Sequence, residues 1–230
     1  MIANPQNVKA SWKPFFESQK DNLIEINAYL GELQKEAICP SPANIFKAFE
    51  MTELHDFSVL LLSQDPYING EACGLAFSIA DGHKISPSLR NIFAEINHSM
   101  GVDNRVSDGD LSSWTDRVLL LNTSLTTERG RAGAHRKVWK RFASDLIDFI
   151  AANRQDFVML AWGTHAHKVS ERLEGVKVIK TSHPSPLGYT KHGKDFTAFK
   201  GSNCFNVVND MLLSIGHAPC SWKLNSKANV

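Results

Sequence analysis

The sequence predicts an α/β fold: a single domain in which a central four-stranded parallel sheet is flanked by helices on both faces. Short apolar runs alternate with helical patterns along the chain, and polar residues follow each run. This alternation favours parallel strands, because each connection then has room for a right-handed crossover helix. The 230 residues are 43% hydrophobic and 21% charged, which is typical of a folded domain and excludes disorder for most of the chain.

The expected strands are four runs rich in leucine and β-branched residues, as in strands buried on both faces of a parallel sheet. They cover residues 58–62, 117–121, 157–162 and 176–180. Helical patterns follow the first three runs, over residues 88–99, 138–152 and 165–173. We expect further helices over residues 10–34, 43–49 and 203–215. One domain then spans residues 1–230, with an N-terminal helical segment at 1–55 and a short tail at 217–230.

The composition excludes several classes of protein. No apolar run approaches the roughly 18 residues of a membrane-spanning helix, and the N-terminus lacks the basic start and apolar core of a signal peptide. We therefore expect a cytoplasmic protein, or a nuclear one if the host is eukaryotic or viral, with no membrane partner. The widely spaced cysteines match neither a zinc site nor a redox pair, so we expect free thiols, no metal and no cofactor at Cys39, Cys73, Cys204 and Cys220.

The net charge of +1 gives no support for a strongly basic nucleic-acid-binding domain. Positive charge is nevertheless concentrated in two segments, residues 128–141 and 180–200. Taken alone, each segment can equally be a binding site for an acidic partner or an ordinary solvated surface.

Polar residues follow all four expected strands, at the edge of the sheet where open parallel sheets bind their ligands. The four segments are Ser63-Gln64-Asp65-Pro66-Tyr67, Asn122-Thr123-Ser124, Gly163-Thr164-His165 and Ser182-His183-Pro184-Ser185-Pro186-Leu187. One polar strand end is an ordinary loop, but four that converge predict a site.

Asp65 and His183 are a carboxylate and an imidazole that can orient a water and stabilise charge at a carbon undergoing substitution. Each can equally serve a turn or fill a hydrogen bond. The Asn122 amide can complement the edge of a nucleobase, and the alternative is that it forms a turn. The Phe77 ring can stack on another ring, and the alternative is that it packs in the core. The sequence has no GxSxG elbow and no GxxxxGK[ST] loop, which disfavours a serine hydrolase and a P-loop enzyme.

Five ordered segments resemble the family 1 uracil-DNA glycosylases, and the likeness extends from about residue 12 to residue 222. The segments are Gln64-Asp65-Pro66-Tyr67, residues 74–78, residues 119–123, Trp162-Gly163 and residues 183–187. The resemblance implies a monofunctional glycosidase of base excision repair. Such an enzyme flips uracil out of DNA, hydrolyses its N-glycosidic bond, releases free uracil and leaves an abasic site, without a cofactor or metal.

The resemblance also implies roles for individual residues. Asp65 would orient water and stabilise an oxocarbenium-like sugar, and His183 would donate a hydrogen bond to uracil O2. Four residues would bind the base: Asn122 by reading its N3 and O4 edge, Phe77 by stacking, Tyr67 by excluding the methyl group of thymine, and Gln64 through its backbone. Leu187 would fill the vacated base stack as a wedge. Loop residues would hold DNA phosphates, namely Ser88, Gly163, Thr164 and Ser185.

The implied partners are uracil-containing DNA, single- or double-stranded, and a DNA-mimicking inhibitor protein, with the enzyme itself a monomer. Two departures from the family pattern stand out, because Ser63 and Ile68 replace its usual Gly and His. The segment after Leu187 is also longer than usual. It carries Lys191, His192 and Lys194, and we hypothesise that it adds phosphate contacts that partly compensate for Ile68.

Three alternatives to this prediction stay open. A bifunctional lyase is disfavoured because no lysine stands where a strand-end nucleophile is expected. An iron-sulfur glycosylase is disfavoured because the cysteines are scattered. The third is a DNA-binding or scaffold protein of the same fold whose catalysis is weakened by Ser63 and Ile68, and a uracil-release assay separates it from an active enzyme.

Overall fold

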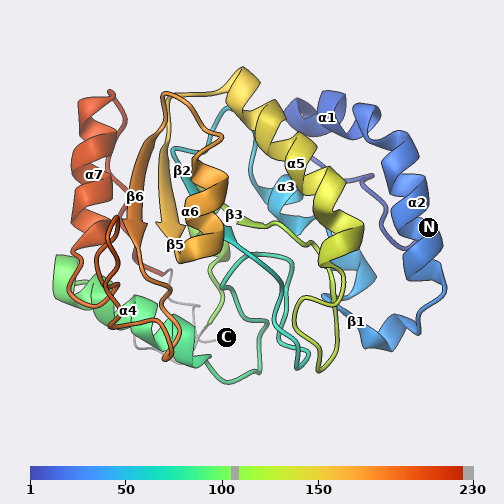
Figure 1. Ribbon diagram of the computed structural model, residues 1–230, viewed down its shortest axis with the longest axis horizontal. Helices are drawn as coiled ribbons and strands as arrows, with labels where there is room; N and C mark the ends of the chain where they lie inside the picture. Colours follow the sequence, from blue (N-terminus) through green and yellow to red (C-terminus); the bar gives the residue numbers. More distant parts are fainter. Residues whose placement is uncertain (105–108, 225–230) are drawn as a thin grey trace, which may run out of the picture.

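A computed structural model describes residues 1–104 and 109–224 (Figure 1). Its centre is a four-stranded parallel sheet in the order β3-β2-β5-β6. The strands are β2 (Val59–Ser63), β3 (Val118–Asn122), β5 (Val158–Trp162) and β6 (Lys177–Thr181). The predicted fold class is confirmed, and each strand lies within one residue of its predicted position.

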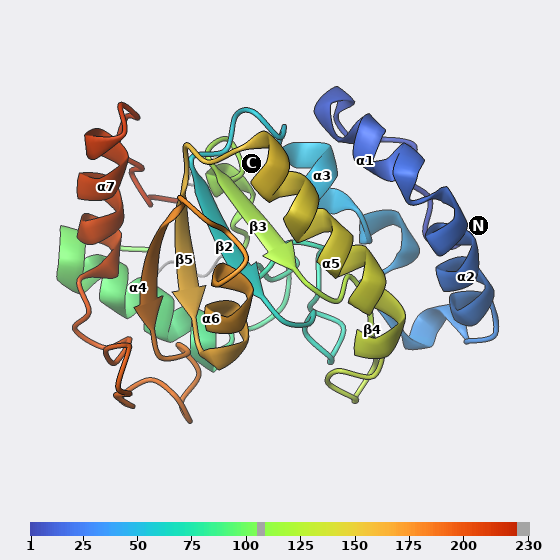
Figure 2. The same cartoon turned by 45° about the horizontal axis from the view of Figure 1, so that its top comes forward.

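The helices between the strands cover both faces of the sheet (Figures 1 and 2). α4 (Pro87–Met100) connects β2 to β3, α5 (Arg136–Asn153) connects β3 to β5, and α6 (Thr164–Ser170) connects β5 to β6. The chain reverses direction across the sheet after β3, so right-handed crossovers place α4 on one face and both α5 and α6 on the other. α7 (Cys204–Ser214) packs against α4. The reversal opens a crevice at the carboxyl end of β2.

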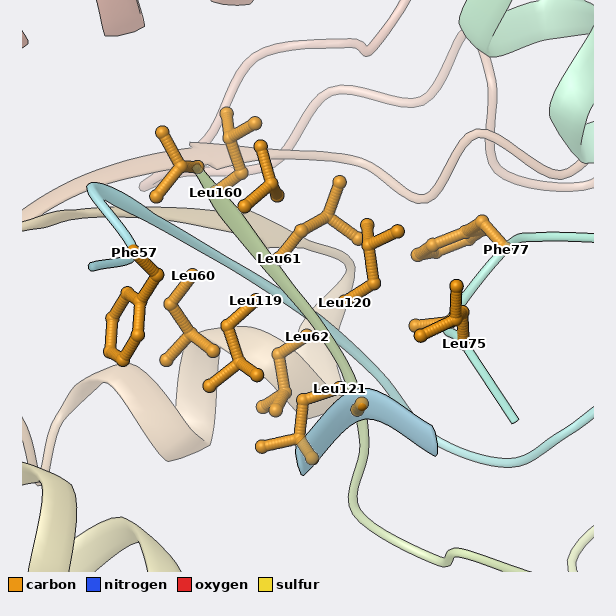
Figure 3. Packing of buried hydrophobic residues seen from close by; sticks show 14 of the residues in the cluster. Phe57, Leu60, Leu61, Leu62, Leu75, Phe77, Leu119, Leu120, Leu121 and Leu160 are labelled. Carbon is orange, nitrogen blue, oxygen red and sulfur yellow. The ribbon is translucent and has the colours of Figure 1, made fainter. Parts of the chain in front are cut away.

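The strands are apolar on both faces because helices cover both. Leu60, Leu61, Leu119 and Leu120 are fully buried, and Figure 3 shows the strand leucines pointing to either side of the sheet. Each such leucine contributes about 1.5 to 3 kcal/mol through its burial. The chain after β2 returns to this core, since the Ala76 N–H donates to the Leu120 carbonyl oxygen at 3.1 Å and Phe77 packs beside Leu120 (Figure 3).

The predicted helices after the strands are confirmed, and local signals explain their ends. α4 begins at Pro87 because the Ser86 side chain accepts the Leu89 N–H at 3.1 Å, and it stops at Gly101, whose φ is 68°. α6 begins directly after Gly163, whose φ of 85° ends β5 abruptly. The predicted closing helix corresponds to α7.

The prediction of one helix over residues 10–34 was wrong. The segment contains η1 (Ala10–Trp12), α1 (Lys13–Ser18) and α2 (Lys20–Gly31). The break falls at Gln19, whose side chain donates to Asp145 of α5 at 3.0 Å, so a distant contact overrides the local helical pattern. The chain then continues through η2 (Lys35–Ala37), and residues 43–49 divide between η3 (Pro42–Asn44) and α3 (Lys47–Met51).

A second, two-stranded antiparallel sheet was not predicted. It pairs β1 (Ile38–Cys39) with β4 (Thr127–Glu128), and two residues a strand are too few for a periodic signal. η4 (Ser112–Trp114) precedes β3. All four cysteines are free and buried. None of the described helices combines the length and apolar character that a membrane span needs. The last residues of the predicted tail, 225–230, lie outside the described part of the chain.

Candidate active site

A cavity of about 190 Å³ lies at the carboxyl ends of β2 and β3. Asp65, from the loop after β2, and His183, from the loop after β6, both line it. Parallel strands bring these loops together although they are far apart in sequence. The cavity collects seven of the predicted site residues, namely Gln64, Asp65, Tyr67, Phe77, Ser88, Asn122 and His183.

The Asp65 carboxylate is held by the guanidinium group of Arg136. Arg136 Nε donates to Asp65 Oδ1 and Arg136 Nη2 donates to Asp65 Oδ2, both at 2.7 Å. The Asp65 side chain is only 10% exposed, and Arg136 is 47% exposed at the start of α5. Two parallel charge-assisted bonds fix the orientation of a carboxylate. They also raise the pKa of Arg136 above its usual value. Arg136 was not identified from the sequence, although it lies in the basic segment 128–141.

The His183 ring is held as a neutral imidazole with its proton on Nε2. The Ser185 backbone N–H donates to His183 Nδ1 at 3.0 Å, so Nδ1 is an acceptor and carries no proton. Burial lowers the pKa of His183 below its usual value, which keeps the ring uncharged at pH 7. The remaining nitrogen, Nε2, is therefore a hydrogen-bond donor.

Gly163 leaves space for the loop that carries His183. A Cβ atom at Gly163 would lie 3.1 Å from the His183 Cβ, and the backbone φ of 85° is one that other residues rarely adopt. The glycine at the start of α6 thus allows the close approach of β5 and the His183 loop.

Asn122, the last residue of β3, has an unpaired acceptor in the cavity wall. The residue is 5% exposed, and its Oδ1 is buried without a hydrogen-bond partner among the described residues. A buried unpaired polar group costs about 1 to 3 kcal/mol. A bound molecule that offers an N–H group would remove this cost.

Two aromatic side chains give the cavity fixed walls. Phe77 has a left-handed backbone, with φ 63°, and its ring lies 5.3 Å from the Trp162 ring and 5.8 Å from His183, centroid to centroid. The Tyr67 hydroxyl bonds to Ser86 Oγ at 2.8 Å and to the Phe77 carbonyl oxygen at 3.3 Å. Burial raises the pKa of Tyr67 to about 12. Ser86 was not predicted as a site residue, because its only local signal is that of a helix cap.

The other predicted DNA-binding residues do not line the cavity, as far as the structure describes the chain. Gly163 lies close to the His183 side chain, and the Ser185 N–H donates to His183 Nδ1. Leu187, four residues after His183, is 84% exposed. Two of the four residues expected to bind phosphate lie in helices and not in loops, and the helical pattern over residues 88–99 had already predicted this for Ser88. Ser88 lies in the first turn of α4 and Thr164 is the first residue of α6, where free backbone N–H groups point outward.

The departures from the family pattern lie next to the cavity. Ser63 lines it, and the Ser63 carbonyl oxygen accepts the Thr123 N–H at 3.1 Å. The Ile68 carbonyl oxygen accepts the Gly130 N–H at 2.8 Å and so ties the loop after β2 to the basic segment. Lys191 and Lys194 are exposed. Within residues 1–104 and 109–224, no three His, Cys, Asp or Glu side chains are grouped as metal ligands.

Comparisons with known proteins agree on one group of enzymes. The family described as the uracil DNA glycosylase superfamily matches residues 49–212. A relative from Acinetobacter baylyi named uracil-DNA glycosylase is 35% identical, over 98% of this chain and 99% of its own. The uracil-DNA glycosylase of Bacillus subtilis is 36% identical, over 91% and 90%. The crystal structure of mimivirus uracil-DNA glycosylase has a TM-score of 0.87 at 27% identity, over 94% of this chain and 87% of that one. A variant of mimivirus UNG in complex with UGI has the same TM-score and identity, over 94% and 89%.

Proposed function

Because the chain belongs to the uracil-DNA glycosylase superfamily, we propose that the cavity between Asp65 and His183 is where it cleaves uracil from DNA. The enzyme is a DNA repair glycosidase that hydrolyses the N-glycosidic bond of deoxyuridine, releasing uracil and leaving an abasic site. The observation that carries the site assignment is that both residues line one cavity. Release of uracil from a single-stranded oligonucleotide tests it, since that substrate does not require a base pair to open.

Within the superfamily, we assign the chain to family 1. The five sequence segments support this assignment, and two of them supply Asp65 and His183.

The flipped uracil would enter the cavity with its ring against Phe77. As the bond from the sugar C1′ to uracil N1 breaks, positive charge develops on the sugar and negative charge on uracil O2. Asp65 would stabilise the sugar cation and orient the attacking water, while the His183 Nε2–H would donate to O2. The water oxygen bonds to C1′ as the bond from C1′ to N1 breaks. The water gives up one proton to the surrounding solvent, and the uracil anion leaves and takes up one proton from the solvent.

Arg136 would keep the Asp65 carboxylate aimed at the sugar. Each carboxylate oxygen accepts one guanidinium N–H and retains a further lone pair for the water. Arg136 is therefore a positioning residue in this mechanism.

Asn122 and Tyr67 would select the base. The unpaired Asn122 Oδ1 would accept the uracil N3–H and the amide nitrogen would donate to O4. Cytosine has no N3–H and presents an amino group instead of O4, so it leaves both Asn122 groups mismatched. The Tyr67 ring, held by Ser86, would occupy the space of the thymine methyl group.

Asn122→Asp is expected to release cytosine, because a carboxylate oxygen can accept from the cytosine amino group. Its uracil release is expected to fall by on the order of 10²-fold, since the donor to O4 is removed. Chromatography of the free bases released from oligonucleotides with one uracil or one cytosine measures both the uracil release and the cytosine release. Asn122→Ala serves as the control, which should lose uracil release without gaining cytosine. Unchanged preference in Asn122→Asp would show that selection resides elsewhere.

Leu187→Ala is expected to slow uracil release from duplex DNA by about tenfold or more and to leave single-stranded DNA nearly unaffected. Only a duplex has a stack that the leucine must fill. The ratio of kcat/KM on the two substrates measures this. Leu213→Ala removes another exposed leucine, on α7, and should not change the ratio. An equal loss on both substrates would contradict the wedge role.

The DNA strand would pass over the loops around the cavity. We propose phosphate contacts from Ser88, Gly163, Thr164 and Ser185, and weaker ones from Lys191 and Lys194. We also propose that the enzyme can bind an inhibitor protein, which is supported by the structure of a mimivirus UNG variant in complex with UGI. The enzyme would act as a monomer.

A further inference from the structure

A second cavity, of about 360 Å³, lies beside the active site between α5 and α6. We name it the α5–α6 cleft. The two helices lie on the same face of the sheet (Figure 2), and α6 begins at the carboxyl edge where Asp65 and His183 lie. Four basic side chains line the cleft, namely Arg136, Lys137, Lys140 and Arg172.

The positive charge of the cleft is only partly neutralised by the protein. Arg136 is paired with Asp65, and Arg172 donates to Asp148 Oδ1 at 2.5 Å. Lys137 and Lys140 are exposed and form no ion pair with any residue that the structure describes. The whole chain carries a net charge of only +1, so this excess is local. Two unpaired ammonium groups in a concave site attract an anion.

Three apolar side chains line the cleft beside the polar ones. They are Ala143 and Ile147 of α5 and Val169 of α6. The cleft is also larger than the uracil cavity, at about 360 against 190 Å³. A cationic rim around an apolar wall suits a nucleotide unit, whose phosphate is charged and whose base is largely apolar on its faces.

The cleft and the active site share parts. Gln64 lines both cavities, and its carbonyl oxygen accepts the Ser124 N–H at 2.9 Å and the Thr123 hydroxyl at 3.2 Å. Thr123 Oγ1 in turn bonds to His165 Nε2 at 2.8 Å, and His165 lines the cleft. Arg136 lines the cleft while it holds Asp65. The two cavities are therefore adjacent, so that one DNA strand can reach both.

We propose that the α5–α6 cleft binds a backbone phosphate of a nucleotide flanking the uridine in the substrate strand, with Lys137 and Lys140 as its ligands. This inference rests on the proposed function and adds a subsite to it. Lysine is well suited to the task, because its ammonium group contacts phosphate oxygens without a fixed geometry.

The test is the double variant Lys137→Ala/Lys140→Ala, assayed on a single-stranded oligonucleotide over a salt series. KM is expected to rise about threefold to tenfold with kcat unchanged, because the lysines do not touch the reacting atoms. The slope of log kcat/KM against log salt is expected to become shallower by about 0.7 for each phosphate that the variant no longer binds. A structural defect would lower kcat or thermal stability instead.

Lys9→Ala/Lys13→Ala is the matched control. It removes the same charge at the opposite edge of the sheet, where Trp12 donates to the Thr52 carbonyl oxygen and the Thr52 hydroxyl donates to Thr115, just before β3. Its KM and salt slope should equal those of the wild type. If the double variant at positions 137 and 140 matches this control, the proposal is wrong.

Substrates with a single neutral methylphosphonate locate the phosphate. At one flanking position the neutral linkage is expected to raise the KM of the wild type but not that of Lys137→Ala/Lys140→Ala. Equal effects in both proteins at every position would overturn the proposal. A second outcome would also overturn it: inorganic phosphate inhibits the wild type but not the double variant, and no position of the methylphosphonate distinguishes the two proteins. The cleft would then bind a free anion and not the DNA backbone. Uracil release by the wild type from the unmodified strand tests the proposed function separately.

Discussion

Asp65→Asn is expected to lower kcat for uracil release by on the order of 10³-fold, the largest effect of any single substitution in the cavity. The amide keeps the size of the side chain but removes the negative charge that would face the sugar cation. It also replaces one acceptor by a donor, so the Arg136 guanidinium loses one of its two bonds at 2.7 Å.

Saturating single-stranded oligonucleotide and single-turnover kinetics measure this loss apart from DNA binding, and KM should change little. Asp145→Asn is the control, since it removes a carboxylate on α5 that pairs with Arg141 away from the cavity. A thermal melt shows whether both variants fold. A folded Asp65→Asn enzyme with the kcat of the wild type would remove Asp65 from the mechanism.

His183→Gln is expected to lower kcat by on the order of 10²-fold to 10³-fold, the usual result of losing one donor to a developing anion. The imidazole donor is aimed by the bond from the Ser185 N–H to Nδ1. The glutamine side chain is flexible, and its amide group does not reproduce the positions of both Nδ1 and Nε2 of the imidazole ring.

The same kinetics measure the effect, with His192→Gln on the exposed segment after Leu187 as the control. Nitrogen NMR of the histidine rings adds an independent readout. Because burial lowers the pKa of His183, its ring should be neutral at pH 7 and protonated on Nε2. A spectrum with the proton on Nδ1, or with a charged ring at pH 7, would contradict the proposed hydrogen bond to O2.

The sheet could be predicted from the sequence because its signal is local. Strands buried on both faces are continuous apolar runs, and the loops between them are long enough to show their own helical periodicity. The break at Gln19 and the pairing of β1 with β4 could not be predicted in this way. One depends on a side chain 126 residues away, and the other on strands of two residues.

The candidate site, too, has residues that the sequence predicts and residues that it does not. Asp65, Asn122 and His183 each follow an apolar run, so topology alone places them at one edge of the sheet. Arg136 and Ser86 do not, and their roles arise from contacts across 71 and 19 residues. Local patterns identify the groups at strand ends, whereas the groups that hold them in position appear only when the chain is folded.

The backbone of Phe77 has a consequence for how the free energy of DNA binding is used. A left-handed conformation at a residue other than glycine costs on the order of 1 kcal/mol or more. Two hydrogen bonds maintain it here: the Ala76 N–H donates to the Leu120 carbonyl oxygen, and the Tyr67 hydroxyl donates to the Phe77 carbonyl oxygen. Folding therefore supplies this cost before any ligand arrives. The wall is preorganised. In the proposed mechanism little entropy would be left to lose when uracil enters, and more of the attraction to the DNA backbone would remain to draw the base out of the helix.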